Sequence, residues 1–575
     1  MSMTPGGPAE RPEYLDGSGP AQPVPGDDSK KRLIALGAIV AGGAVVAGGA
    51  WAASSFFATG SQPAEALPAS TVAYVSVDLD PSGGQKIEAI KTLRKFPGFT
   101  DQVDIKSDED LRERLFEEIT SSGECEGLDY DADVKPWLGS RAAMAVVDLG
   151  EDEPTPVGVV QTSDAGKAED GLSALIDACG GGEDGGDAEA STDVGGWVVE
   201  GDWIVVAETR EIAQKVVEAA DGSPLAGDAA FEEWTGEAGD DGFMSMYVGK
   251  AVTKYMDDFG ATGAMLGGPL FSGAADPMEL SSECLAGATT TEEIDACLNE
   301  PASETSSEEV PPELQQMVDD FDGMAATVRF DDGAVEIEYA TSDYQPDMTK
   351  FLASKTGAEM VAGLPEDTIA AFGFSLGEGW AQGLLDYIKS VAPDEAASVD
   401  DQIAQFESET GLAFPEDIET LLGEGVTVSV GGGIDPDAIA NGGPQEVPAG
   451  ITIKGDADEI QAVLDKISAA VGYEAEDYLQ VTEADGHAVL ALQDDYRSSL
   501  ESESGLGDSA AYTDVIDGDA QTVFYLNFDA DDDWLVRLAE DDPEISKNLE
   551  PLAAFGVSGW VDDDVVHGLV KITTD

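Results

Sequence analysis

The sequence predicts an α+β fold: two duplicated units, each a mixed or antiparallel sheet covered by helices, behind a single N-terminal transmembrane helix. Three observations predict it. One long uncharged run follows a basic cluster near the start of the chain. Sequence blocks that lie between residues 67 and 332 recur, in the same order, between residues 364 and 563. Within each copy, strand patterns are joined both by tight turns and by helical patterns, which is typical of a sheet with helical layers.

The uncharged run covers residues 33–53 and directly follows Lys30-Lys31-Arg32. About 21 residues at a helical rise of about 1.5 Å span about 31 Å, close to the thickness of a bilayer's hydrocarbon core. Basic residues favour the cytoplasmic side, so we expect the chain after about residue 60 to be extracytoplasmic. A cleaved signal peptide is the alternative, because Ala50-Trp51-Ala52 fits the small-residue cleavage pattern.

Acidic residues dominate the part of the chain that follows this run. The chain has 117 Asp and Glu against 28 Lys and Arg, a net charge of −89. Such a surface repels phosphate, so the sequence excludes nucleic acid as a partner and disfavours anionic lipid head groups. Residues 1–32, rich in Pro, Gly and Ser and without apolar periodicity, are predicted to be a disordered cytoplasmic tail.

The four cysteines all lie beyond the apolar run, and they are Cys125, Cys179, Cys284 and Cys297. An even number of cysteines in an oxidising compartment predicts two disulfides. Three pairings are possible, and we favour the local one, Cys125 with Cys179 and Cys284 with Cys297. No C-x-x-C pattern occurs, so the cysteines predict no metal site.

Four sequence blocks indicate the duplication. Leu67-Pro68-x-x-Thr71-x-Ala73 recurs as Leu364-Pro365-x-x-Thr368-x-Ala370, an offset of 297 residues. The further blocks align residues 127–139 with 411–423, Phe243 and Tyr247 with Phe524 and Phe528, and 330–332 with 561–563. About 50 extra residues fall between Lys250 and Met324 of the first copy, so that copy carries an insert.

The elements of each copy follow in one order. After the Leu-Pro motif, alternating apolar residues predict a strand, and a helix with apolar spacing comes next. Asp133 and Asp417 are interpreted as N-caps of a short helix that ends at Gly139 and Gly423. Two strands, an amphipathic helix, a hairpin such as the one at Gly201-Asp202 and a last hairpin around an Asp-Asp turn complete the unit. The residues that define the first strand and helix are Ala73, Val75, Val77, Ile87, Ile90 and Leu93, and in the second copy Ala370, Phe372, Phe374, Leu384, Leu385 and Ile388.

The predicted organisation is a cytoplasmic tail (1–32), a transmembrane helix (33–55), a linker (56–66), a first ectodomain repeat (67–342, with an insert at about 251–323), a connecting segment (343–363) and a second repeat (364–575).

One pattern suggests catalysis. Gly373-Phe374-Ser375-Leu376-Gly377 matches the G-x-S-x-G nucleophile elbow, for which His487 or His567 would have to act as the base. The aligned residue of the first copy is Asp78, and there the segment is an ordinary turn from strand to helix. The sequence therefore predicts no catalytic residue and no cofactor, and an extracytoplasmic serine hydrolase using Ser375 remains the alternative.

A calcium-loop pattern is incomplete. Asp129-x-Asp131-x-Asp133 begins like an EF-hand, but Val134 stands where Gly is required and Ser140 where Glu is required. We therefore predict no metal site, and a cation-responsive module is a further alternative.

Several blocks resemble a known family. Residues 67–82, Lys95-Phe96-Pro97-Gly98-Phe99 and residues 133–139 resemble an actinobacterial membrane-anchored family catalogued as domain of unknown function 3352. The resemblance implies a short cytoplasmic tail, one transmembrane helix and a large external region, and it supplies no catalytic residues. The second copy departs from these blocks, with Ser375 in place of Asp78.

Together these features lead us to expect a non-enzymatic binding or structural module of the cell envelope. Its N-terminal helix would hold it in the cell membrane, with the N-terminus in the cytoplasm and the C-terminal ectodomain outside. An envelope protein or a cell-wall component would be its partner.

Overall fold

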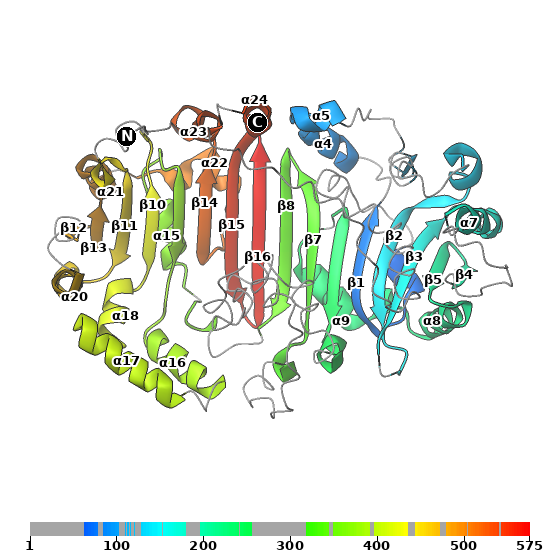
Figure 1. Cartoon of the computed structure of the whole chain (residues 1–575), viewed down its shortest axis with the longest axis horizontal. Coiled ribbons are helices and arrows are strands. Elements are labelled where there is room, and N and C mark those ends of the chain that lie inside the picture. Colours follow the sequence, from blue (N-terminus) through cyan, green and yellow to red (C-terminus); the bar gives the residue numbers. More distant parts are fainter. Residues whose placement is uncertain are drawn as a thin grey trace, which may run out of the picture.

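The computed structural model describes residues 62–255 and 318–575, except for 79–83, most of 103–127, 180–195, 344–348, 392–395, 435–442, 472–478 and a few single residues. In these parts of the chain, 16 strands form one sheet, and every neighbouring pair of strands is antiparallel (Figure 1). Helices lie on both sides of the sheet. The α+β prediction is confirmed, and the sheet is antiparallel rather than mixed.

The two halves of the sheet have the same strand order. From the centre outward it is β8-β7-β6-β1-β2-β3-β5-β4 in one half and β16-β15-β14-β9-β10-β11-β13-β12 in the other. The strands of the first half are β1 (Thr71–Asp78), β2 (Leu138–Val147), β3 (Thr155–Thr162), β4 (Gly196–Glu200), β5 (Trp203–Ala207), β6 (Met244–Gly249), β7 (Gly323–Asp331) and β8 (Ala334–Ser342). Those of the second half are β9 (Ala370–Phe374), β10 (Val426–Val430), β11 (Ala449–Lys454), β12 (Thr482–Ala484), β13 (His487–Ala491), β14 (Thr522–Asn527), β15 (Leu552–Asp562) and β16 (Val565–Thr574).

The halves meet where β8 pairs with β16. Glu338 pairs with Leu569, the residue that corresponds to it at the offset of 231. Ala334 pairs with Thr573 and Ser342 with Val565, so the pairing is symmetric about Glu338. The seam is therefore a pseudo-twofold contact between equivalent edge strands, and it removes an edge from each half-sheet.

A charged network crosses the seam. Glu336 accepts hydrogen bonds from Arg329 Nε at 2.6 Å and from Lys571 Nζ of β16 at 2.6 Å. The Arg329 guanidinium also donates to Glu338, with Nη2 at 2.5 Å from Oε2. The Glu336 side chain is 6% exposed, so this network of two carboxylates and two cations links β7, β8 and β16 largely out of water.

The Leu-Pro motif makes the same contacts in both halves. Thr71 Oγ1 donates to the Pro68 carbonyl at 2.7 Å, and Thr368 Oγ1 donates to the Pro365 carbonyl at 2.7 Å. The carbonyl before each proline, on Leu67 or Leu364, accepts from a backbone N–H of a later 3-10 turn. The motif is thus a local turn that fixes the start of β1 and leads toward β9.

Two sequence interpretations need correction. The strand register places Tyr247 opposite Tyr74, as Tyr525 lies opposite Ala371, so Tyr247 corresponds to Tyr525. The predicted alignment of Phe243 with Phe524 and of Tyr247 with Phe528 is therefore wrong by three residues. Burial decides this register, because both tyrosines lie in the core.

The N-cap assignment of Asp133 and Asp417 is also wrong. Asp133 lies inside the helical turn Tyr130–Val134, and Asp417 lies inside α18 (Glu416–Leu422). Each carboxylate reaches back to a backbone N–H four residues earlier, Asp133 to Asp129 at 2.9 Å and Asp417 to Ala413 at 2.6 Å. Gly423 ends α18 with a positive φ as expected, whereas the predicted helix end Gly139 lies in β2.

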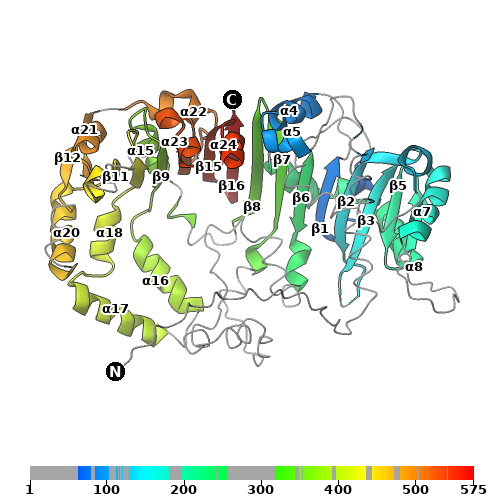
Figure 2. The same cartoon turned by 45° about the horizontal axis from the view of Figure 1, so that its top comes forward.

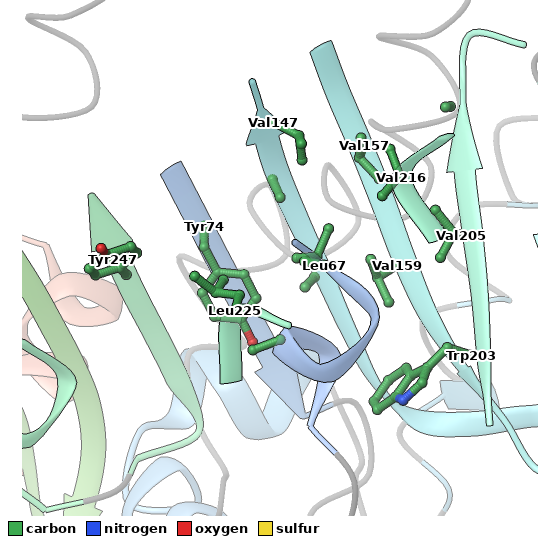
Figure 3. Packing of buried hydrophobic residues seen from close by; sticks show 14 of the residues in the cluster. Leu67, Tyr74, Val147, Val157, Val159, Trp203, Val205, Val216, Leu225 and Tyr247 are labelled. Atoms are coloured by element: carbon green, nitrogen blue, oxygen red, sulfur yellow. The ribbon is translucent and has the colours of Figure 1, made fainter. Parts of the chain in front are cut away.

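The sheet has two faces, which we name by their residues: face A carries Tyr74 and Tyr525, and face B carries Val77 and Phe372. In the first half, α8 (Arg210–Gly222) and α9 (Ala229–Glu237) cover face A over a core centred on Leu67 and Leu225 (Figure 3). Face B is covered there by α4 (Gly84–Leu93), α7 (Ala165–Cys179) and the turn at Tyr130–Val134. The short helix α5 (Pro97–Gln102) packs beside α4.

In the second half, face A is covered by α15 (Thr356–Ala362), α21 (Asp494–Ser502) and α22 (Ala510–Thr513). Face B is covered by α18 and α20 (Ala457–Val471) at one end of the strands only. The remaining helices are α16 (Trp380–Val391), α17 (Ala396–Thr410), α23 (Ala530–Leu538) and α24 (Pro543–Leu549). Figure 2 shows α16 and α17 set apart from the strands of the second half.

Among the described residues, which begin at 62, no helix is long and apolar enough to span a bilayer. The predicted anchor at 33–55 lies outside them, as does the greater part of the predicted insert, residues 256–317.

Candidate functional site

An uncovered row of apolar side chains crosses four neighbouring strands of face B in the second half. Ile451 of β11 pairs with Val428 of β10, Val428 pairs with Phe372 of β9, and Phe372 pairs with Phe524 of β14. Their side chains are 38%, 45%, 39% and 38% exposed in that order. We call these four residues the apolar strip.

The strip contrasts with the next row along the same strands. Phe374, Val426 and Ile453 lie two residues away from strip residues and so point to the same face. Val426 and Ile453 are each 5% exposed, because α18 and α20 pack on them. The helical cover of face B therefore stops beside the strip.

The helix closest in sequence also leaves apolar side chains uncovered. On α16, Leu384 and Ile388 lie one turn apart and are 36% and 38% exposed, and Phe406 of α17 is 38% exposed. The principal neighbours of α16 are α17 and α18 rather than the sheet. The region thus has two solvent-exposed apolar surfaces, one on the strands and one on the helices.

The first half shows why α16 is not packed on the sheet. Its counterpart α4 places Ala89 against Val328 and Phe330 on face B, beside Ile337. At the offset of 231, Gly559 and Gly568 replace Val328 and Ile337. Glycine has no side chain for a helix to pack on. The second half therefore lacks the apolar side chains against which α4 packs in the first half. The Tyr339 ring covers Gly568, whereas a Cβ on Gly559 would meet nothing nearer than 4.0 Å.

Ser375, the predicted nucleophile of the hydrolase alternative, has a buried hydroxyl. It is 1% exposed, donates to the Ser354 carbonyl at 2.7 Å and accepts from the Gly357 N–H at 3.0 Å. These bonds fix the start of α15 against the end of β9. In the first half the corresponding Asp78 forms an ion pair with Arg141 at 3.5 Å, also buried. Both positions thus make structural contacts in the same part of the fold.

The histidines are far from this hydroxyl in the sheet. His487 begins β13, and His567 lies in β16, where it stacks on Trp560 with ring centroids 5.1 Å apart. The Nε2 atom of His567 is 3.8 Å from a carboxylate oxygen of Glu237. The structure therefore does not bring either histidine together with Ser375 in the way that a nucleophile elbow requires.

The acidic residues of the calcium-like pattern are occupied by local contacts. Asp129 accepts from the Ala132 N–H at 2.9 Å, Asp131 pairs with Lys135 Nζ at 2.5 Å, and Asp133 accepts from the Asp129 N–H. Within the described residues, no three His, Cys, Asp or Glu side chains are grouped as metal ligands would be.

The predicted disulfides fall outside what the structure describes. Cys125, Cys284 and Cys297 are not among the described residues. Cys179 is the last residue of α7, and its side chain is also outside the description. Both pairings therefore stay predictions.

A small pocket lies in the first half, beside the Asp78–Arg141 pair. It is lined by these two residues together with Gln62, Ser76 and Phe243, and its volume of about 10 Å³ holds little more than one water molecule. It is too small for an organic ligand.

Sequence reasoning missed the apolar strip. Alternation in β9 and β10 predicted one buried apolar face for each strand, and nothing local indicates which helix covers that face. The available signal was the replacement of Val328 and Ile337 by Gly559 and Gly568 in the second copy.

Only part of the chain matches a family of known proteins. Residues 33–258 match the model of a family described as "Protein of unknown function (DUF3352)". The match includes the predicted anchor and ends just after β6, so it stops before the seam and the apolar strip. No curated protein and no solved structure gives a significant match.

Proposed function

We propose that this protein is a non-enzymatic binding module of the cell envelope, held by an N-terminal membrane anchor with its sheet outside the cytoplasm. The apolar strip is its binding surface. The family match adds only a domain of unknown function, so the proposal rests on the physical features of this chain.

The observation that carries the proposal is the exposure of Phe372, Val428 and Phe524 beside a row, at Val426 and Ile453, that α18 and α20 cover. Exposing large apolar side chains to water costs roughly 25 cal/mol for each Å², so a contiguous row of them is typical of an interaction site. The four side chains of the strip provide apolar contact but no acid, base or nucleophile. Their chemistry therefore favours binding over catalysis.

The anchor and location in this proposal are supported by the apolar run at 33–53 behind its basic cluster. The serine hydrolase remains the alternative. It requires that a serine-reactive probe label the chain at Ser375 and that Ser375→Ala abolish this labelling. Because the hydroxyl is 1% exposed and bonded to two backbone groups, we expect no labelling.

Site-specific photo-cross-linking in intact cells tests the proposal. Benzoylphenylalanine in place of Phe372 is expected to form a defined adduct, because the side chain at this position would contact the natural ligand. The same residue at Phe524 should capture the same adduct. The matched control is position 87, since Ile87 of α4 is apolar and 60% exposed but lies in the first half. Adducts equal in kind and yield at 87 and 372, or none at 372 and 524, would contradict the proposal.

A further inference from the structure

We infer that the apolar strip binds the acyl chain of a membrane phospholipid, a step that rests on the proposed function and names its ligand. The four strip residues carry no polar side-chain atoms. The backbone groups between them are paired in the strand ladders. Among the described residues, the four strip side chains therefore offer a ligand only apolar contact.

The outline of the strip fits a linear chain. One side chain from each of four adjacent strands forms a single row, which spans about 14 Å between the outer strands at about 4.8 Å per strand. On one side the flanking row at Val426 and Ile453 lies under α18 and α20, and on the other side Ala370, Val430 and Ala449 are half-buried. The exposed side chains therefore form a single row across the strands. A straight aliphatic chain follows such a row, whereas a compact or branched ligand does not.

The area of the strip disfavours a protein partner. Four side chains of roughly 200 Å² each, about two-fifths exposed, offer about 300 Å². This is less than the apolar part, somewhat over half, of the roughly 800 Å² that each partner buries in a standard protein interface. The same area is ample for one hydrocarbon chain, because each buried CH₂ contributes about 0.8 kcal/mol.

The negative charge of the protein limits which lipid head groups can approach the strip. With a net charge of −89, the protein repels free fatty acids and anionic head groups. A phospholipid with a zwitterionic head group avoids this repulsion. The predicted anchor at 33–53 holds the sheet near a bilayer that supplies such lipids.

The helices α16 and α17 carry further exposed apolar side chains. Leu384 and Ile388 project from the same side of α16, one turn apart. The sheet of the second half does not offer α16 the side chains on which α4 packs in the first half. A chain bound on the strip would offer these two residues the apolar contact that Gly559 and Gly568 cannot. We expect α16 to approach the strip when lipid is bound.

Photolabelling of the full chain in lipid nanodiscs tests this inference. The discs contain phosphatidylcholine with a small fraction of phosphatidylcholine that carries a diazirine in its palmitoyl chain, and peptide mapping locates the adducts after irradiation. Adducts are expected on the anchor at 33–53, which serves as the internal control, and on β9, β10 and β14. Phe372→Asp with Phe524→Asp should lower the strip adducts at least tenfold and leave the anchor adducts unchanged.

Matched variants guard against a folding artefact. Val428→Asp, at the most exposed strip position, should repeat the loss, and Ile87→Asp, which adds the same single charge on exposed α4, should change nothing. A labelled anchor with an unlabelled strip overturns the inference and leaves the proposed function standing. Strip labelling by diazirine palmitate but not by the phospholipid also overturns it. Absence of adducts from both anchor and strip contradicts the anchoring in the proposed function as well.

Discussion

Replacing Glu336 by Gln is expected to lower the free energy of unfolding by about 3 kcal/mol or more, the range found when one member of a buried ion pair is removed. Glu336 holds Arg329 and Lys571 at 2.6 Å each, with a side chain that is only 6% exposed. Glutamine keeps the shape but not the charge, so Lys571 loses its carboxylate partner across the seam. The two halves of the sheet would then be less strongly joined.

Chemical denaturation of the full chain, followed by tryptophan fluorescence, measures this change. The control is Asp131→Asn in the Lys135–Asp131 pair, whose side chains are 43% and 68% exposed. An exposed pair contributes between about 0 and 1 kcal/mol, so the control should be nearly neutral. A Glu336→Gln effect as small as that of Asp131→Asn would show that the seam does not depend on this network.

Raising the pH from 8 to 11 is expected to destabilise the fold by about 5.5 kcal/mol through four of its buried tyrosines. Burial raises the pKa of Tyr247, Tyr496, Tyr512 and Tyr525 to about 12. In the unfolded chain these phenols ionise near pH 10, so the stability they contribute is complete below pH 10 and is lost as the pH rises toward 12. At pH 11 each tyrosine accounts for about 1.4 kcal/mol of that loss.

Unfolding curves at several pH values, together with the absorbance of tyrosinate, check this expectation. Tyr512→Phe removes one ionising group while keeping the ring that contacts Tyr525, with centroids 5.3 Å apart. This variant should lose about 1.4 kcal/mol less than the parent between pH 8 and pH 11. Equal stability of the parent at both pH values, or ionisation of all 13 tyrosines near pH 10 in the folded chain, would contradict the burial argument.

Much of the fold is readable from local sequence. Alternating apolar residues identified the strand at Thr71–Asp78, and the Gly201-Asp202 turn identified the hairpin of β4 and β5. These features depend on side-chain period and on φ preference, which act over a few residues. The short helix was less predictable, because the carboxylates of Asp133 and Asp417 can cap from inside a turn as well as from its first position.

The binding surface could not be predicted in the same way. Phe372 and Val428 have the pattern of ordinary core residues, and their exposure depends on where α16 lies. That position is set by contacts between distant segments, and residues 559 and 568, which correspond to side chains beside α4, are glycines. The first copy shows the difference, because there Val328 and Ile337 provide the apolar side chains beside α4.

Cysteine accessibility in intact cells tests the central claim most directly, namely that face B of the second half is open and lies outside the cytoplasm. Val428→Cys is compared with Met144→Cys, the equivalent strand position of the first half, which is half-buried where Val428 is 45% exposed. With a membrane-impermeant maleimide and peptide mapping, we expect position 428 to react about tenfold faster than position 144. Equal rates would contradict an open strip, and modification of position 428 only after lysis would contradict its placement outside the cell.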